Sequence, residues 1–208
     1  MFLNLTEVKK LMKHAYKNSG LVVGCQRGLI AANSAGTWGF RVDERHIPKK
    51  LKAAVVELIG DLPEEGEIYT YCWNGLRQVM EPGHFDFYAG WSAATDYAVQ
   101  TPLLFQAPEG EYSFYQIRSN MGLCVLDQPL ASLISPKDLD HGEEEMPDGY
   151  PGFDGDTLYW KNETMIYWAK TAKLNQNAEE QFLPRLNVWD YFQNKPLEKG
   201  EAVWESQS

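Results

Sequence analysis

The densest group of side chains that could bind a small ligand is an acidic stretch in the second half of the chain. Its carboxylates are Asp138, Asp140, Glu143, Glu144, Glu145, Asp148, Asp154 and Asp156. Calcium sites use about six to eight such oxygens, but their loops place acids at alternate positions before a glycine and end on a glutamate. The spacing here does not follow that pattern, so we interpret residues 136–156 as a long, solvated acidic loop.

Other arrangements that could support catalysis are sparse. Asp154 and Asp156 could form an acid/base pair, but a turn beside a strand accounts for them more simply. The four histidines and three cysteines are scattered, whereas zinc sites need them at short spacing. Neither a phosphate-binding P-loop nor a GxGxxG strand–helix motif is present. The sequence predicts a protein that is not an enzyme and that carries no metal or cofactor.

Charge is distributed unevenly along the chain. The formal net charge of the 208 residues is -10. Residues 1–60 hold 10 basic and 4 acidic side chains, whereas residues 61–208 hold 9 basic and 25 acidic ones. Such asymmetry is typical of a protein that meets a polyanion or another charged partner.

The basic residues of the first part fall on two predicted helices. Asn4 is a helix N-cap type, and apolar residues from Leu5 to Tyr16 recur at helical spacing. Opposite them lie Lys9, Lys10, Lys13 and Lys17. A second helix is predicted to begin with Pro48 at its first position, and Lys49, Lys50 and Lys52 surround its first turn.

Short alternating segments predict strands around these helices. Three are expected at 21–26, 29–33 and 37–42, and three more at 67–73, 76–80 and 84–90, with a hairpin turn at Asn74-Gly75. Later hairpins are expected at 111–127 and 157–168. We therefore predict an α+β protein with antiparallel sheets, in which residues 1–95 carry the two amphipathic helices and residues 96–208 form a β-rich acidic part.

Two stretches of the first part resemble a known family. Residues 11–24 resemble the first helix and strand of phage-type DNA sliding clamps, the processivity factors of polymerases. Residues 51–67 resemble the second helix of those clamps and its turn into the outer sheet. In that family the sheets lie outside and basic helices line a central hole, although the protein is acidic overall. The resemblance covers about residues 1–95, and we find no second copy of the pattern in residues 96–208.

The resemblance implies a replication accessory protein that binds the DNA backbone without sequence preference, through the seven lysines named above. It also implies a homo-oligomer and a polymerase or another nucleic-acid enzyme as partner. Residues 185–192 have the aromatic positions of a clamp-binding peptide in Trp189, Tyr191 and Phe192, although Arg185 stands where glutamine is usual. Three widely separated cysteines favour a reducing compartment, so we expect a cytoplasmic location.

A second hypothesis explains the charge differently. The acidic part could present a polyanionic surface that blocks a nucleic-acid enzyme, as a phage-type inhibitor would. Glu143, Glu144 and Glu145 would then bind a basic protein, and neutralising them should weaken that contact. The sign of the partner's charge separates the two hypotheses.

Overall fold

The computed structural model describes residues 1–80, 86–139, 145–173 and 191–192. The helices of these ranges are α1 (Leu5–Asn18), α2 (Lys49–Ile59), α3 (Phe87–Ala93) and α4 (Gln128–Ala131). The strands are β1 (Leu21–Cys25), β2 (Gly28–Asn33), β3 (Trp38–Asp43), β4 (Ile68–Tyr71), β5 (Arg77–Val79), β6 (Asp96–Ala107), β7 (Gly110–Ile117), β8 (Leu123–Asp127), β9 (Gly152–Asp154), β10 (Thr157–Lys161) and β11 (Met165–Lys170). Short 3-10 helices occur at Glu44–His46 and Pro136–Asp138.

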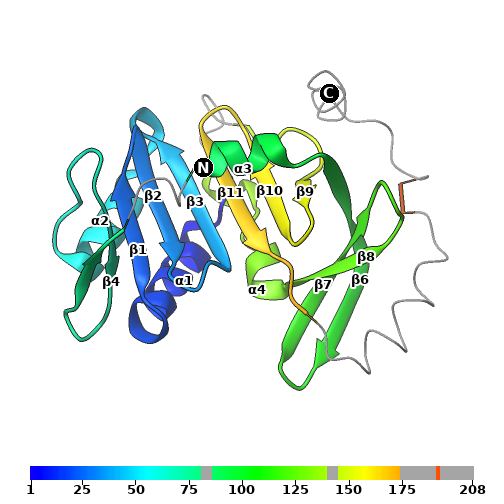
Figure 1. Cartoon of the computed structure of the whole chain (residues 1–208), viewed down its shortest axis with the longest axis horizontal. Coiled ribbons are helices and arrows are strands. Elements are labelled where there is room, and N and C mark those ends of the chain that lie inside the picture. Colours follow the sequence, from blue (N-terminus) through cyan, green and yellow to red (C-terminus); the bar gives the residue numbers. More distant parts are fainter. Residues whose placement is uncertain (81–85, 140–144, 174–190, 193–208) are drawn as a thin grey trace.

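The strands of the described ranges form one eleven-stranded sheet in the order β5-β4-β1-β2-β3-β11-β10-β9-β6-β7-β8 (Figure 1). Every pairing between neighbouring strands is antiparallel. The predicted α+β class with antiparallel pairing is confirmed. The division into residues 1–95 and 96–208 stays a prediction, and the pairing of β3 with β11 joins strands from both sides of that boundary.

Helices cover both faces of the sheet. The main core contains Met12 of α1, Leu51 of α2 and Leu130 of α4, all packed on one face. A smaller cluster on the other face places Phe87 of α3 against Ile30 and Ile166. Side chains that alternate along each strand supply both clusters, which is the period-two pattern expected for a strand. The basic helices α1 and α2 therefore share one side of the molecule.

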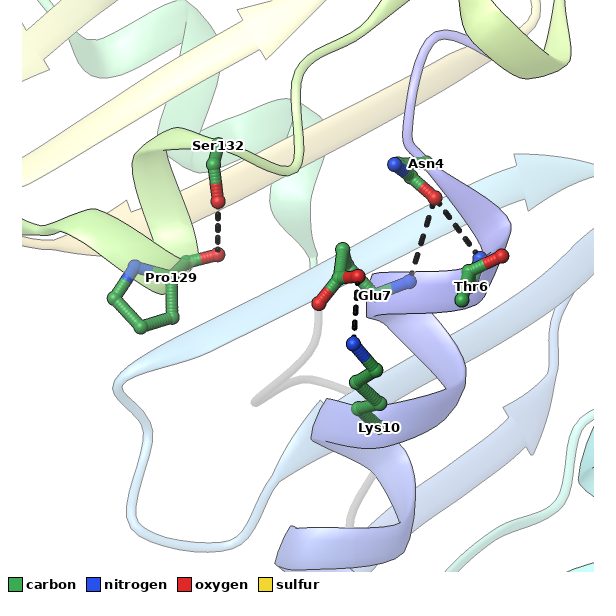
Figure 2. Close-up of polar contacts among 6 residues, drawn as sticks. All are labelled: Asn4, Thr6, Glu7, Lys10, Pro129 and Ser132. Atoms are coloured by element: carbon green, nitrogen blue, oxygen red, sulfur yellow. Dashed lines mark hydrogen bonds and ion pairs between the residues drawn. The ribbon is translucent and has the colours of Figure 1, made fainter.

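Local polar contacts fix where α1 begins. The side-chain oxygen of Asn4 accepts hydrogen bonds from the backbone N–H groups of Thr6 (3.0 Å) and Glu7 (3.4 Å) (Figure 2). The N–H of Leu5 donates to Asp138 Oδ2 at 2.9 Å, so a carboxylate also lies at the positive end of the helix dipole. These contacts satisfy N–H groups that the helix itself leaves unpaired.

The predicted strand at 84–90 is wrong where the structure describes it, because residues 87–93 form α3. Asp86 Oδ1 accepts from the N–H of Ala89 at 3.0 Å and caps this helix. Phe87 then packs against Trp168, with ring centroids 5.8 Å apart. Over a few positions, closely spaced aromatic residues can match either the alternating pattern of a strand or the spacing of a helix, and here they follow the helix.

Three further differences from the predictions concern the start of α2, the strand β6 and the interval 136–156. Pro48 is the N-cap of α2 rather than its first helical residue. The twelve-residue β6 was not predicted, because Pro102 interrupts its pattern and the sheet register shifts between Gln100 and Leu104. The interval 136–156 is not loop throughout, since it contains the 3-10 helix Pro136–Asp138 and β9; residues 140–144 lie outside the described ranges. The hairpins predicted at 111–127 and 157–168 are confirmed.

In the described ranges, no helix combines the length and the apolar character that crossing a membrane requires.

Replacing Asn4 with alanine removes both side-chain capping bonds of α1. We expect Asn4→Ala to lower the free energy of unfolding by about 1 kcal/mol, measured by urea denaturation. Thr6→Ala, at an exposed position of the same first turn, is the control and should change stability by less than about 0.5 kcal/mol. Equal effects of the two substitutions would show that the cap does not stabilise α1.

Candidate nucleic-acid interface

The seven predicted DNA-binding lysines lie on two helices that contact each other. Lys9, Lys10, Lys13 and Lys17 of α1 are all exposed, and so are Lys49, Lys50 and Lys52 of α2. The apolar sides of both helices are buried against the sheet, which leaves their basic sides toward solvent. The structure thus brings the two sequence-predicted lysine groups together on one side of the molecule.

One of these lysines, Lys10, forms an ion pair that a phosphate group would have to displace. Lys10 Nζ lies 2.9 Å from Glu7 Oε1, one turn earlier on α1 (Figure 2). Among the described residues, the other six lysines form no ion pair with a carboxylate. An exposed pair of this kind contributes little to stability, about 0.2 to 1 kcal/mol, so a phosphate can displace Glu7 at small cost.

Sequence reasoning missed a second charged group close to the start of α2. An open hollow of about 740 Å³ is lined by Arg27, Arg41, Asp43, Glu44, Arg45, His46 and Glu65. The signal in the sequence was the basic run from Arg45 to Lys52, which continues directly into the second helix. Because three arginines face three carboxylates there, the hollow has a balanced charge and differs from the lysine surface.

Arg41 is the most enclosed cation of this hollow. Its guanidinium lies 4.7 Å from the centroid of the Tyr88 ring, and its Nη2 donates to the backbone oxygen of Arg27 at 3.4 Å. Arg41 Nε and His46 Nδ1 are buried without a hydrogen-bond partner among the described residues. Burial raises the pKa of the Tyr88 phenol, and the nearby Asp43 carboxylate raises it further. A neutral phenol beneath Arg41 keeps its ring available to that cation.

The chemistry that this side of the molecule can perform is electrostatic binding. Lysine ammonium groups contact phosphate oxygens and do not distinguish bases, which permits binding without sequence preference. Within the described ranges, no group of three or more His, Cys, Asp or Glu side chains could hold a metal ion. The exposed lysines of α1 and α2 offer contacts that suit phosphate groups.

The structure describes only some of the partner-binding residues that the sequence predicts. Glu145 is exposed, whereas Glu143, Glu144 and Trp189 lie outside the described residues. Phe192 is buried against Tyr97 and Tyr150, with ring centroids 6.0 and 5.7 Å away. The N–H of Tyr191 donates to Gln116 Oε1 at 2.8 Å. To anchor a partner, Phe192 would have to leave this cluster, and its partner-binding role stays a prediction, as does the acidic-inhibitor hypothesis.

Asp127 is the last residue of β8 and immediately precedes α4. Asp127 is an exposed residue, but neighbouring groups remove part of the water around its carboxyl group and raise its pKa. The same carboxylate helps to raise the pKa of the neighbouring Tyr112 phenol, after the larger effect of that phenol's own desolvation. A carboxylate that loses hydration without gaining a partner favours its neutral form.

The sequence matches no protein-family model and no curated protein. Among solved structures, the chain is similar to the beta subunit of the Streptococcus pyogenes DNA polymerase, with 10% identity, a TM-score of 0.34, and 87% of this chain aligned to 66% of that one. It is also similar to the Helicobacter pylori beta clamp bound to a DNA ligase peptide, with 9% identity, a TM-score of 0.31, and 93% of this chain aligned to 69% of that one. The Bartonella birtlesii sliding clamp gives 9% identity and a TM-score of 0.27, over 94% of this chain and 65% of that one.

These likenesses are weak, because every TM-score is far below 0.5. The chain spans slightly less than two thirds of the length of the Streptococcus pyogenes subunit. The neighbours are bacterial clamps, so the phage-type resemblance of the sequence stays a prediction.

The raised pKa of Asp127 predicts a pH-dependent stability difference. Because its pKa in the folded state lies above that in the unfolded state, this carboxyl stabilises the fold at low pH, and the contribution is lost as the pH rises through the folded-state pKa. Asp127→Asn cannot ionise, so urea unfolding should show its advantage over the wild type growing as the pH rises above the ordinary aspartate pKa of about 3.9. Asp154→Asn, at an exposed position, controls for the loss of one negative charge. An advantage that shrinks with rising pH would contradict this account.

Proposed function

We propose that this protein is a non-enzymatic, clamp-like accessory factor of DNA replication that holds the DNA backbone without reading its sequence. The observation that carries the proposal is the seven exposed lysines on the paired helices α1 and α2. The fold supports it because both helices bury their apolar sides on one face of the sheet. Their lysines can therefore meet a duplex at the same time.

The overall charge is compatible with this role. Residues 61–208 carry 25 acidic side chains against 9 basic ones, so most of the chain repels a polyanion. DNA would then be directed to the lysine surface of the two helices. A polymerase or another nucleic-acid enzyme is the partner that such a factor would serve.

Reversing charge on α1 tests the DNA contact. Lys10→Glu, Lys13→Glu and Lys17→Glu together should abolish binding to a fluorescent duplex of random sequence, measured by anisotropy at low salt. The wild type should lose affinity steeply as salt rises, because phosphate contacts release counterions. All three positions are exposed, so we expect the far-UV circular dichroism and the urea midpoint to be little changed.

The control variant makes the same change in net charge elsewhere. Lys161→Glu, Lys170→Glu and Lys173→Glu reverse three lysines that follow or belong to the β10–β11 hairpin. This variant should retain most of the DNA affinity. Unchanged DNA binding in the α1 variant, or equal losses in both, would refute the proposed interface.

A homo-oligomer belongs to the same proposal. β5 is the last strand at one end of the sheet. Val79 in this strand and Leu76 just before it are 74% and 67% exposed. Trp73, in the preceding turn, is 69% exposed. An exposed apolar edge strand favours pairing with another strand, which supports self-association at this end.

Light scattering at several concentrations tests the oligomer. We expect a mass that is a stable multiple of the monomer for the wild type. Leu76→Lys with Val79→Lys should shift the protein to monomer, because two charges at the edge oppose strand pairing. Gln106→Lys with Glu109→Lys, in and after β6, is the control pair and should leave the mass unchanged. A wild type that is monomeric at every concentration would exclude the oligomer.

A further inference from the structure

A small aromatic cluster lies on the face of the sheet opposite to the one that α1, α2 and α4 cover. Val99 of β6 and Gln116 of β7 are partners in the strand register, and their neighbours Ala98 and Ile117 belong to the main core. Because side chains alternate along a strand, Val99 and Gln116 point away from that core. The cluster beside them is built from four separate parts of the chain: Tyr97, Val99, Met121, Tyr150, Tyr191 and Phe192.

Two members of the cluster, Tyr191 and Phe192, contact the others as a bound peptide would. The N–H of Tyr191 donates to Oε1 of the fully buried Gln116 at 2.8 Å. The ring of Phe192 meets Tyr97 and Tyr150 edge-on, with centroids 6.0 and 5.7 Å away. A main-chain hydrogen bond that gives affinity and a side-chain contact that gives specificity are the two elements of peptide recognition.

The rest of the aromatic site is held by contacts that do not involve these two residues. The rings of Tyr97 and Tyr150 stack on each other, with centroids 5.9 Å apart and planes 4° from parallel. Gln116 Nε2 donates to the backbone oxygen of Met121 at 3.2 Å, which fixes the orientation of the amide. The backbone N–H of Arg118 donates to the backbone oxygen of Tyr97 at 2.9 Å. The site is therefore organised before any ligand enters it.

We propose that Tyr191 and Phe192 are a releasable strap over a binding site for an aromatic segment of another protein. The ligand would place an aromatic ring against Tyr97 and Tyr150 and donate a backbone N–H to Gln116. The residue before that ring cannot be proline, because proline has no N–H to donate. Since the strap belongs to the same chain as the site, it competes with every outside segment as an intramolecular ligand, so the site stays closed until a partner displaces it.

The chemistry of the open site supports replacement of the strap by a ligand of the same kind. Release of the strap removes the Tyr191 donor from a buried amide oxygen and exposes apolar ring surface, and both changes are unfavourable in water. A ligand that supplies the same two groups offsets both.

Arg118 adds a further preference for an aromatic ring. Its guanidinium lies 5.1 Å from the centroid of the Phe192 ring, and its side chain is exposed at the edge of the site. A cation over a ring face is attracted to it, so Arg118 favours an aromatic side chain over an aliphatic one. The aromatic site lies on the face opposite the lysine-bearing helices, so this proposal does not depend on the DNA contact.

The test uses the full-length protein and a fluorescein-labelled peptide with the sequence of residues 187–194, followed by anisotropy. The wild type should bind the peptide weakly, because its own strap competes. Phe192→Ala weakens the strap and should bind the peptide about tenfold more tightly or better, equivalent to about 1.4 kcal/mol. A peptide with alanine at position 192 should bind neither protein. Equal affinities of the two proteins, or of the two peptides, would show that the pair is a permanent part of the fold.

Two variants made together with Phe192→Ala locate the binding. Arg118→Ala removes the cation over the ring and should weaken the peptide by about threefold. Lys137→Ala removes another exposed cation outside the site and should leave the affinity within about twofold. An affinity that Arg118→Ala does not reduce would refute the site.

A second readout separates a partner protein from another copy of the chain. Light scattering of the wild type and of Phe192→Ala should give the same mass. Dimers of the wild type that Phe192→Ala abolishes would assign the site to a second copy and overturn the proposal. Far-UV circular dichroism checks the fold, and if Phe192→Ala is unfolded, Phe192→Leu takes its place, because it keeps an apolar side chain and loses the ring.

Discussion

The antiparallel pairing of β3 with β11 is the contact on which the rest of the structure depends. It places Phe40 opposite Tyr167, both buried, and makes one sheet from strands that are more than 120 residues apart in sequence. The hydroxyl of Tyr167 donates to the backbone oxygen of Leu130 at 3.1 Å, which fixes α4 on the face that α1 also covers. Without this pairing, α4 would not lie on the same side of the molecule as the two lysine-bearing helices.

Local signals in the sequence identified much of the first part of the fold. The period of apolar residues and the Asn4 cap are enough to define α1, because both act within a few residues. The strands around Arg27-Gly28 and Asn74-Gly75 follow from turn chemistry in the same way. By contrast, α3 depends on Phe87 packing against Trp168. The strand β6 pairs with β7 across a break in register near Pro102, and its first residues pair with the more distant β9. Such long-range contacts leave no periodic pattern in one short window.

The same distinction between local signals and long-range contacts applies to the candidate interfaces. The lysines of α1 and α2 could be predicted because an amphipathic helix shows its polar side in the sequence itself. That the two helices contact each other could not, since tertiary packing decides it. The hollow around Arg41 could not be predicted either, because Arg27, Arg41 and Glu65 line one surface only after three separate segments have packed together. Charge composition revealed that acids were abundant, but it did not indicate which of them share a concave surface.

The register shift in β6 divides the β6–β7 hairpin into two parts. Beyond the register shift, residues 104–107 of β6 and their β7 partners extend as an arm that ends at Glu109 and Gly110. Thr101 Oγ1 holds the base of this arm by donating to the backbone oxygen of Phe114 at 3.1 Å. At about 3.3 Å per residue the arm is roughly 15 to 20 Å long, so a bend of about 10° at its base moves the tip by about 3 Å. Substitutions at Thr101 or Pro102 would thus displace the tip at Glu109 and Gly110 without changing any side chain of the tip itself.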